Sequence, residues 1–496
     1  MASKAKPVSM LADLVGARVV NGSDPAIHDV THDSRQVAEG SLYVAIRGER
    51  ADGHSFVESA TASGAVAVCV DHEVATDVPQ IVVEDTRAVM GELAAAVHDY
   101  PSTAVDVVGV TGTNGKTTVT HYVESIARHA GLATGLVGTI ATRSGSRSVP
   151  ASLTTPEASE FQRLLAGMRD DGVDLVAAEV SSHALEYGRV RGTRFAVAAF
   201  TNISQDHLDF HGDMEAYRTA KTKLFTDYEV GAAVVNIDDP TGAEIARGYD
   251  RDIITVGSGG DFSVHSVETH SSYSTFTIET AQGVFHRTAP VIGEFNVGNL
   301  VLAAACCVAA GIDHEVVFDA VSHISAVPGR FEVVSGDDPI TVIVDYAHTP
   351  QGVETAVDTG RRLAGRRVIA LLGAGGDRDR RKRPAMGAAL SGADLAIVTS
   401  DNPRSEDPGQ IADAVLSGIE SDAEPVLEID RRRAIDLAID SAQDGDVVLI
   451  LGRGHEPNQD LGSEKVPFDD REVAAAALAR RRRSTESEGR SGSMSP

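Results

Sequence analysis

The sequence predicts an α/β protein whose three domains are built on mostly parallel sheets covered by helices. Short runs of branched apolar residues alternate with helical patterns along most of the 496 residues. This alternation is typical of β–α–β units, whose helices cover both faces of a parallel sheet. Many apolar runs end in glycine-rich or polar loops, and ligands bind at the carboxyl ends of such strands. One of these loops, TGTNGKTT, has the composition of a phosphate-binding loop.

Shifts in composition divide the chain into four parts. We expect a small N-terminal α/β domain at 1–103, a central P-loop-type domain at 104–332, a C-terminal Rossmann-like α/β domain at 333–484 and a disordered tail at 485–496. Disorder is expected for the tail because its residues are charged or polar and offer little apolar surface to bury.

The N-terminal part contains short apolar runs separated by polar turns. The runs LYVAIRG and AVAVCV predict strands at 42–48 and 65–70. Residues 81–100 begin with an apolar triplet and continue with a helical pattern, so we expect a strand followed by a helix there.

Further apolar runs mark the central and C-terminal parts, and each runs into a polar or glycine-containing loop. The segments in which strands are expected are 104–110, 174–180, 195–203, 341–350, 366–376, 395–403 and 446–454. Residues 261–291 alternate with period two instead, which predicts a layer of antiparallel hairpins.

Composition limits the function and the location. The formal charge is 44 − 72 = −28, which argues against nucleic-acid binding. An anionic small substrate would need local Arg, Lys or helix N-termini. We expect no membrane span, because no run of about 18 apolar residues occurs, and no secretory signal, because no apolar region follows the first lysines. Cys69, Cys306 and Cys307 form no metal or disulfide pattern, so we expect buried thiols in a reducing cytoplasm.

The stretch 111–118 predicts a loop that binds phosphate. A strand ends at Val110, glycines at 112 and 115 allow a tight turn with inward N–H groups, and a helix follows up to Gly131. Backbone N–H groups and a helix N-terminus attract phosphate. Lys116 would reach the β- and γ-phosphates, and the Thr117 hydroxyl would bind Mg²⁺. The alternative is a purely structural glycine turn, since position 110 is Val where the general pattern has Gly.

Several motifs together resemble the Mur ligase family. GTNGKTT resembles the ATP loop of the Mur ligases and of folylpolyglutamate synthetase, and residues 33–48 are similar to the nucleotide-sugar domain of the muramyl-tripeptide synthetases. The further motifs that occur in Mur-ligase order are EVSSHALEYGR (179–189), FTNISQDHLDFHGDMEAYRTAKTKLF (200–225), GEFNVGN (293–299), DYAHTP (345–350), GAGGDRDRRKRP (373–384), DNPRSEDP (401–408) and GRGHE (452–456). The resemblance covers about residues 8–480.

This resemblance implies an ATP-dependent ligase of cytoplasmic peptidoglycan precursor synthesis. It implies that meso-2,6-diaminopimelate is added to UDP-N-acetylmuramoyl-L-alanyl-D-glutamate through an acyl phosphate, with ATP and Mg²⁺ as cofactors, and we expect a monomer. The residues it implies for ATP are Gly112, Thr113, Asn114, Gly115, Lys116, Thr117 and Thr118 in the loop, with Asn296, Asn299 and Asp345 at the adenosine.

The chemistry and the resemblance together indicate a metal and acyl-phosphate centre. Two anions must approach each other, so metal ions and cations must offset their repulsion. Glu179, at the end of an apolar strand, is expected to meet Mg²⁺ together with Thr117, and Lys116 to act in catalysis. The resemblance makes His207 a ligand of a second Mg²⁺ and makes Lys221 a carbamylated lysine that binds metal. Lys223 is the alternative position for that lysine.

The resemblance also assigns residues to the nucleotide-sugar end. For the uridine diphosphate these are Ser34, Glu49, Arg50 and Ala51, and for the muramyl peptide they are Thr154, Thr155, Ser181, Tyr187 and Arg189. Hydroxyls in loops are common, so the residue types alone do not establish these contacts.

The stretch DNPR predicts which amino acid is added. A guanidinium binds a carboxylate through two parallel hydrogen bonds, and diaminopimelate differs from lysine by one distal carboxylate. Arg404 should therefore reject lysine, which would leave it unpaired. The resemblance assigns the site to Arg404, Arg378, Asp401, Asn402, Pro403, Gly452 and Glu456. The basic run Arg380–Arg383 has a second interpretation as a solvated surface.

Other functions stay open at this point. The same ligase could add L-lysine or another diamino acid. Folylpolyglutamate synthetase is opposed by the additional N-terminal block and by DNPR. A regulatory nucleotide switch would predict a guanine-reading Asn-Lys-x-Asp motif, and the sequence has none. A protein that only binds nucleotide-sugar is opposed by the presence of Lys116, Glu179, His207 and Lys221.

Overall fold

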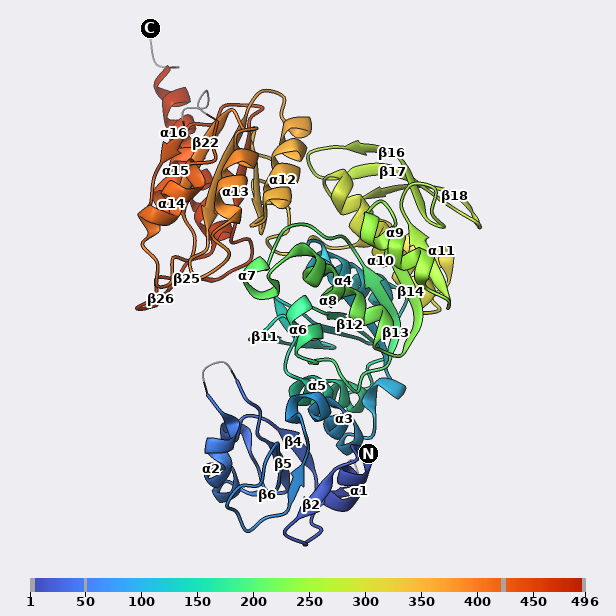
Figure 1. The fold of residues 1–496 in the computed structure, drawn as a ribbon. Helices are drawn as coiled ribbons and strands as arrows, with labels where there is room; N and C mark the ends of the chain where they lie inside the picture. The colour runs from blue at the N-terminus through green and yellow to red at the C-terminus, as the bar shows by residue number, and fades with distance from the viewer. Residues whose placement is uncertain (1–4, 49–50, 421–424, 493–496) are drawn as a thin grey trace. The chain divides into compact units, whose positions relative to one another are not determined.

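The computed structural model describes residues 5–48, 51–420 and 425–492, with side chains up to 483. The chain forms two compact units, and Figure 1 traces its helices and strands in order of residue number. The first consists of residues 1–202, 218–262 and 302–320, and the second of residues 203–217, 263–301 and 321–496. Because the chain passes between the units several times, each is described by itself.

The first unit begins with a five-stranded sheet of order β2-β7-β6-β5-β4, in which only β2 runs antiparallel to its neighbour among the described strands. Its strands are β2 Arg18–Val20, β4 Asp29–Thr31, β5 Ser41–Val44, β6 Ala65–Val70 and β7 Gln80–Val82. Helices α1 Val8–Leu14 and α3 Thr86–Val97 pack on one face, and α2 Val57–Ala62 packs on the other. The strands expected at 42–48 and 65–70, and the strand and helix expected within 81–100, are confirmed.

Short elements complete this part. Strands β1 Lys6–Pro7 and β3 Ala26–Ile27 form a small antiparallel pair. The turns η1 Ser34–Gln36, η2 Gly53–Phe56 and η3 Pro101–Thr103 are 3₁₀ helices.

The same unit contains an eight-stranded sheet of order β11-β10-β9-β12-β8-β13-β14-β15. The parallel strands are β8 Asp106–Thr111, β9 Thr134–Val137, β12 Leu175–Glu179, β13 Phe195–Phe200, β14 Val230–Asn236 and β15 Ile253–Val256, and β10 Ala141–Ser144 and β11 Arg147–Pro150 are antiparallel. The associated helices are α4 Lys116–His129, α5 Ala158–Asp170, α6 Ser182–Glu186, α8 Met214–Thr226, α9 Pro240–Gly248 and α11 His314–Ala320.

Strand β8 lies between β12 and β13, and this position sets the location of the site. Val110 is opposite Glu179, and Thr111 is opposite Phe200. The three strands therefore end side by side, as parallel strands that carry a ligand site do.

The second unit contains an antiparallel three-stranded sheet. Its strands are β16 Ser263–Thr269, β17 Ser274–Thr280 and β18 Gly283–Ala289. Helix α10 Glu294–Ala309 follows, with residues 294–301 in this unit and the rest in the first. This confirms the antiparallel layer expected from the period-two pattern at 261–291. Short helices α7 Leu208–His211 and η4 Val321–His323 also occur.

A six-stranded sheet of order β19-β20-β24-β21-β22-β23 forms the larger part of the second unit. Its strands are β19 Glu332–Val333, β20 Thr341–Asp345, β21 Val368–Ala374, β22 Leu395–Ser400, β23 Val426–Leu427 and β24 Val447–Leu451. Helices α12 Pro350–Leu363, α13 Lys382–Leu390 and α14 Pro408–Leu416 cover one face, and α15 Arg431–Asp440 and α16 Asp470–Gly492 cover the other. A small hairpin pairs β25 Asn458–Asp460 with β26 Lys465–Pro467.

A buried ion pair connects the strand ends of this sheet to α16. Arg431 donates to both Asp470 oxygens at 2.8 and 2.6 Å, and to the carbonyls of Ser400 and Leu451 at 3.2 and 3.0 Å. Arg453 lies 3.5 Å from the same carboxylate. One carboxylate therefore holds two arginines at the carboxyl ends of β22 and β24.

Helix α16 continues to Gly492 and so extends into the segment 485–496, for which disorder stays a prediction. The preceding residues 474–483 are Ala, Leu and Arg, which are good helix formers, and a helix that has begun extends more easily than a new one starts. Residues 493–496 lie outside the described part.

Two expectations from composition can be compared with the structure. In the described residues, no helix is long and apolar enough to cross a membrane. The three cysteines are buried, as expected, and have free thiols.

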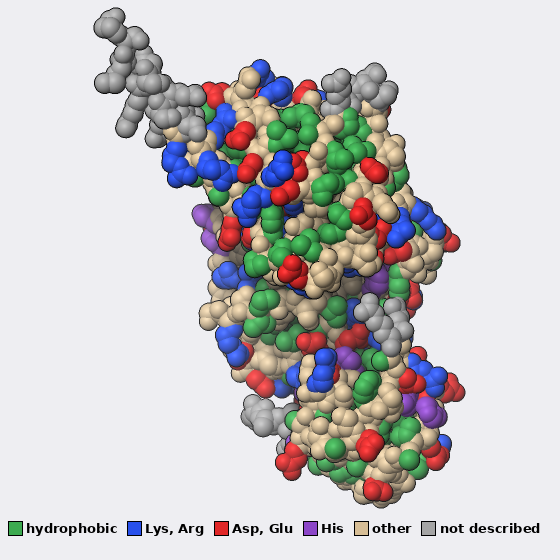
Figure 2. All heavy atoms as spheres, turned by 90° about the vertical axis from the view of Figure 1, so that its left-hand side faces the viewer, with side chains coloured by type: hydrophobic (Ala, Val, Ile, Leu, Met, Phe, Trp, Pro, Cys, Tyr) green, Lys and Arg blue, Asp and Glu red, His purple; other side chains and the backbone are tan. Residues whose placement is uncertain are grey.

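Figure 2 shows basic and acidic side chains interspersed on the face that it draws.

We predict that Asp470→Ala strongly destabilises the second unit. The change leaves Arg431 and Arg453 buried without their carboxylate, and loss of one partner of a buried pair costs about 3–5 kcal/mol. Thermal unfolding followed by circular dichroism should show a large fall in the melting temperature. Glu73→Ala, which removes the exposed Arg18–Glu73 pair (2.7 Å), is the matched control and should change little. Equal small effects would contradict the anchoring role of Asp470.

Candidate functional site

The loop between β8 and α4 has the predicted strand–loop–helix form. Gly112 and Gly115 have φ values of +143° and +88°, which glycine adopts readily. A Cβ at Gly112 would lie 1.8 Å from Thr201 Oγ1, so no larger residue fits. Thr117 and Thr118 lie in the first turn of α4, and the expected helix and its end near Gly131 are confirmed.

Asn202, which follows β13, holds this loop in place. Its carbonyl accepts from Thr113 N–H (2.8 Å), and its Oδ1 accepts from Asn114 N–H (3.0 Å). These two loop amides are thus engaged within the protein, which the glycine pattern did not predict. Lys116 Nζ donates to the carbonyls of Gly112 and Thr113 at 2.9 and 2.8 Å.

Glu179 provides a carboxylate beside the loop, as its position at a strand end predicted. It is 1% exposed. It accepts from Thr117 Oγ1 (2.9 Å) and from Thr139 N–H and Oγ1 (2.7 and 3.1 Å). A Cβ at Gly138 would lie 2.4 Å from Glu179 Oε1, so the segment after β9 can approach this closely only with glycine. Thr139 is a contact that the sequence analysis missed.

The two candidate lysines of α8 have different environments. Lys221 is 1% exposed, and its Nζ donates to the Gly112 carbonyl at 2.6 Å. Lys223 is half-buried and donates to Glu186 at 2.8 Å, away from the loop. The burial and the contact with the phosphate loop favour Lys221 over the alternative at 223.

His207 belongs to the second unit, while Thr117, Glu179 and Lys221 belong to the first. His207 Nε2 lies 3.5 Å from Asp206 Oδ2. Asp206 also contacts Lys382 Nζ at 2.9 Å and His348 Nε2 at 3.6 Å. Burial alone would raise the pKa of Asp206, but these three neighbours hold it well below the usual value. The sequence analysis did not single out Asp206.

The residues assigned to the muramyl peptide lie together near Glu179. Thr155 Oγ1 donates to the Glu179 carbonyl (2.8 Å) and accepts from Ser181 N–H (3.2 Å). Ser181 Oγ caps α6. Thr154 Oγ1 lies 3.1 Å from Thr139 Oγ1.

A pair of arginines extends this region. Glu157 accepts from Arg189 (3.0 Å) and from Arg87 of α3 (2.8 Å), and both guanidiniums lie over the Tyr187 ring at 5.4 and 4.9 Å. The sequence analysis missed Arg87 and Glu157, because nothing in the sequence shows that α3 approaches this loop.

The residues assigned to the uridine diphosphate are only partly described. Ser34 is half-buried in η1, whose N-cap Asp33 accepts from Arg35. Ala51 is exposed, and its carbonyl accepts from Gly48 N–H at 2.9 Å. Glu49 and Arg50 lie outside the described residues.

The adenosine candidates lie in the second unit. Asn296 is buried and donates to the Ile292 carbonyl (3.0 Å), and Asn299 Nδ2 lies 3.5 Å from Asn296 Oδ1. Asp345 accepts from Phe331 N–H (2.7 Å), and burial raises its pKa.

The DNPR stretch follows β22 and is held by buried polar contacts. Asn402 donates to Glu456 (2.6 Å), and its own carbonyl accepts from Gly376 N–H (2.9 Å). Burial and the neighbouring Asp401 raise the pKa of Glu456. Gly452 has a φ of +114°, and a Cβ there would lie 2.7 Å from Asp401 Oδ2. Asp401, Asn402, Gly452 and Glu456 therefore come together as predicted.

Arg404 and Arg378 flank one glycine. A Cβ at Gly375 would lie 3.1 Å from Arg404 Nη1 and 3.7 Å from Arg378 Cγ. Arg404 donates to the Gly376 carbonyl (2.5 Å), and Arg378 donates to the Asp377 carbonyl (2.9 Å). Neither forms an ion pair with the residues that the structure describes.

The basic run after Arg378 is not uniformly solvated. Arg380 is exposed and lies 3.0 Å from Glu406, but Arg383 is buried and donates to the same carboxylate at 2.8 and 3.1 Å. Lys382 is buried against Asp206. The interpretation of 380–383 as a solvated run is thus wrong for these two buried residues. A Cβ at Gly376 would lie 1.9 Å from the Pro403 carbonyl. The segment just before the basic run can therefore pack this closely against DNPR only with glycine at 376.

Sequence profiles of three Mur ligase domains match this chain. They are the Mur ligase family catalytic domain at 26–98, the Mur ligase middle domain at 110–307 and the Mur ligase glutamate ligase domain at 329–454. A curated relative, the UDP-N-acetylmuramoyl-L-alanyl-D-glutamate--2,6-diaminopimelate ligase of Geobacillus thermodenitrificans, is 45% identical over 485 residues, covering 96% of this chain and 99% of the relative.

Solved structures are similar along the same length. A structure of a UDP-N-acetylmuramoyl-L-alanyl-D-glutamate--2,6-diaminopimelate ligase has a TM-score of 0.67 at 32% identity, covering 93% of this chain and 97% of that one. The Mycobacterium tuberculosis folylpolyglutamate synthase has a TM-score of 0.60 at 20% identity, covering 80% of this chain and 94% of that one. The second similarity is one of fold.

We predict that Gly112→Ala weakens nucleotide binding at least tenfold while leaving the chain folded. The added Cβ would collide with Thr201 and would require a backbone conformation that alanine rarely adopts. A fluorescent ATP analogue should show at least a tenfold loss of affinity. Gly131→Ala is the matched control, since its φ is also positive (+86°) but nothing lies within 4 Å of the added Cβ. It should lose some stability and keep its nucleotide affinity. Unchanged binding by Gly112→Ala would contradict the assignment of the loop.

Proposed function

The chain belongs to the Mur ligase family, and from this premise we propose that it joins meso-2,6-diaminopimelate to UDP-N-acetylmuramoyl-L-alanyl-D-glutamate with conversion of ATP to ADP and phosphate. One observation carries the proposal: 45% identity to a ligase of that name extends over 96% of the chain. Both nucleotides are cytoplasmic metabolites, so we place the reaction in the cytoplasm, and we propose that the enzyme is a monomer.

At the ATP end, we assign the triphosphate to residues 112–118 and the adenosine to Asn296, Asn299 and Asp345. Lys116 would pair with the β- and γ-phosphates. The position of Lys116 on the carbonyls of its own loop supports this, because the ammonium already lies inside the turn that would receive the phosphates.

The donor set beside the loop fits Mg²⁺. Mg²⁺ prefers oxygen ligands, and Thr117 and Glu179 provide a hydroxyl and a carboxylate 2.9 Å apart. In the described residues, Glu179 is bonded to neutral donors and forms no ion pair, so a cation would complete its environment. Bound there, Mg²⁺ would offset the repulsion between the γ-phosphate and the substrate carboxylate. On the family resemblance we assign His207 to a second Mg²⁺.

We propose that Lys221 is carbamylated. The reaction of its amine with CO₂ forms an N–C bond and releases a proton, which replaces a cation by a carboxylate. Burial supports this, because a group with only 1% exposure is protected from water. The modified side chain would offer two further oxygens to a metal beside the phosphate loop.

The reaction itself requires few groups from the protein. A D-glutamate carboxylate oxygen bonds to the γ-phosphorus while the bond from phosphorus to the β–γ bridging oxygen breaks, which gives an acyl phosphate and ADP. The amine of the amino acid then bonds to the carbonyl carbon and loses a proton, and phosphate leaves with the C–O electron pair. The residues of the chain serve to position the reactants and to offset negative charge.

We assign the sugar-peptide substrate to the N-terminal part and to the loops beside Glu179. The residues proposed are Ser34, Glu49, Arg50 and Ala51 for the uridine diphosphate, and Thr154, Thr155, Ser181, Tyr187 and Arg189 for the peptide. The clustering of the last group around Glu179 and Glu157 supports the assignment, because it borders the place where the carboxylate must react.

We assign the amino acid to Arg378, Asp401, Asn402, Pro403, Arg404, Gly452 and Glu456. The partners of the arginines support this. Arg404 and Arg378 donate to neutral carbonyls, so a substrate carboxylate would gain a charge-assisted bond without displacing a protein carboxylate. The nearby carboxylates Asp401 and Glu456 suit a distal ammonium.

The function is tested by measuring phosphate release and amide formation with the muramyl-dipeptide nucleotide, ATP and a panel of amino acids. We expect release that depends on meso-diaminopimelate, with a new amide detected by mass spectrometry. Dihydrofolate with glutamate is the control for the folylpolyglutamate alternative and should give none. Release that is independent of diaminopimelate, or equal with lysine, would overturn the proposed substrate.

We predict that Arg404→Ala lowers kcat/KM for diaminopimelate about 100-fold or more. Two charge-assisted hydrogen bonds contribute roughly 3 kcal/mol or more together. Turnover of lysine, already low because it leaves Arg404 unpaired, should not fall in parallel. Arg380→Ala is the control, because Arg380 is an exposed neighbour paired with Glu406. A proportional loss for both amino acids in Arg404→Ala would show that Arg404 does not select the substrate.

A further inference from the structure

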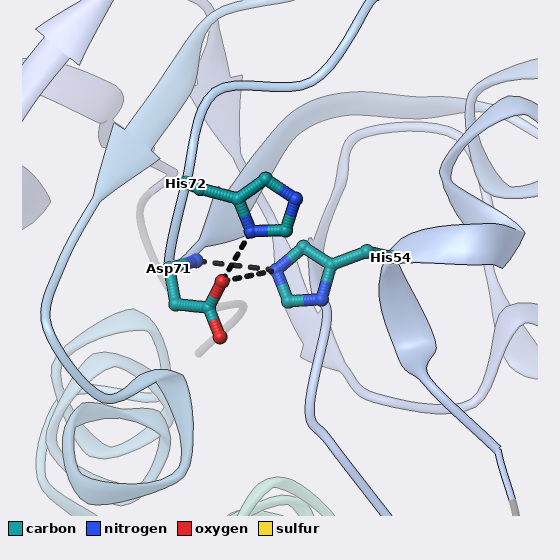
Figure 3. Close-up of side chains that lie close together, drawn as sticks. All are labelled: His54, Asp71 and His72. Atoms are coloured by element: carbon teal, nitrogen blue, oxygen red, sulfur yellow. Dashed lines mark hydrogen bonds and ion pairs between the residues drawn. The ribbon is translucent and has the colours of Figure 1, made fainter.

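Three side chains of the N-terminal sheet converge at a place that the proposed reaction does not use. His54 lies in η2, and Asp71 and His72 follow β6 (Figure 3). His54 Nε2 lies 3.3 Å from Asp71 Oδ1, and His72 Nδ1 contacts the same oxygen. One ligand atom from each of the three residues lies within 4.8 Å of the others.

The protein fixes the orientation of His54. Its Nδ1 lies 2.6 Å from Asp52 Oδ1, and its Nε2 accepts from Asp71 N–H at 3.2 Å. This pattern places the ring proton on Nδ1, toward Asp52, and leaves the lone pair on Nε2. A carboxylate on the far nitrogen is the arrangement that orients metal-binding histidines.

His54 Nε2 and Asp71 Oδ1 lie 3.3 Å apart. The two atoms can therefore bind the same cation, which would take the place of the Asp71 N–H on the Nε2 lone pair. Arg47 supplies a positive charge nearby, since its Nε donates to Asp71 Oδ2 at 2.7 Å and its Nη2 to Oδ1 at 3.1 Å. Arg47 approaches mainly through Oδ2, so Oδ1 keeps capacity toward the two imidazoles.

The cluster is also accessible from one side. The side chains of His54 and Asp71 are 6% and 16% exposed, whereas that of His72 is 53% exposed. Two ligands are thus preorganised by packing, and the third lies at the surface with its ring stacked 4.6 Å from that of His54. Water can complete the coordination on the open side.

We propose that His54 Nε2, an Asp71 oxygen and His72 Nδ1 bind one divalent transition-metal ion of the zinc class. Imidazole suits Zn²⁺, Co²⁺ and Ni²⁺, whereas Mg²⁺ prefers oxygen ligands, and two of the three ligands here are imidazoles. The ion would join η2 to the segment after β6 and would be distinct from the Mg²⁺ expected beside Glu179.

The test is Co²⁺ and Zn²⁺ binding to the full-length protein after removal of metal with a chelator. Equilibrium dialysis gives the stoichiometry, and the visible absorption of Co²⁺ reports nitrogen ligands. Excess Mg²⁺ and a His207→Ala background keep the proposed ligase metals out of the measurement. We expect one ion at this cluster, seen as a Co²⁺ absorption band and as a bound equivalent that is lost when His72 is replaced.

The variants separate ligands from neighbours. His72→Ala should weaken binding at least tenfold and remove the absorption band. Because the His72 side chain is exposed, its replacement should not disturb the fold, and the loss can then be assigned to the missing ligand. Asp52→Asn should weaken binding about 10–100-fold, as loss of a carboxylate behind a ligating histidine does. His265→Ala removes a surface histidine 3.2 Å from Glu279 and should leave binding unchanged.

Circular dichroism is used to check that each variant is folded before its metal binding is compared, which matters most for His54→Ala because His54 is buried. The proposal is overturned if the parent protein binds neither ion, which would show that the cluster holds protons only. It is equally overturned if the folded His72→Ala variant binds Co²⁺ with the parent affinity and spectrum. Neither result bears on ligase activity with ATP and Mg²⁺, so the proposed function is tested separately.

Discussion

A carboxylate almost entirely removed from water, that of Glu179, organises the site of the first unit. A buried carboxylate is costly unless its oxygens are hydrogen-bonded. Here the bonds come from Thr117 in the phosphate loop and from Thr139 after β9, while the Glu179 carbonyl accepts from Thr155. Glu179, at the end of β12, thus fixes three loops. The groups that donate to it are neutral, so its negative charge is not offset and can attract a cation.

The second unit uses a different anchor for the same purpose. The buried Asp470 holds Arg431, and Arg431 in turn binds the carbonyls of Ser400 and Leu451, the last residues of β22 and β24. The loops that follow these strands carry Asn402 and Glu456, which bond each other. A desolvated ion pair adds little net stability, but in some proteins it fixes one specific geometry. Here it sets the spacing of the two loops that would bind the amino acid.

Local patterns were sufficient to predict most strands, the phosphate loop and the position of Glu179, because each depends on residues close in sequence. The antiparallel layer at 263–289 also follows from period-two alternation alone. Contacts between distant segments were not predictable: Arg87 meets Glu157 because α3 packs near α5, and no local signal encodes that approach.

The partners of the basic side chains explain how a chain of charge −28 can bind anions. Basic residues that hold the structure are already paired with carboxylates: Arg383 with Glu406, and Lys382 with Asp206. Arg404 and Arg378 donate to carbonyls instead. A carbonyl orients a guanidinium without cancelling its charge, so attraction for an anion is kept at short range. Beyond about 10 Å, salt screens the acidic surface, and these local charges would then select the substrate in the proposed site.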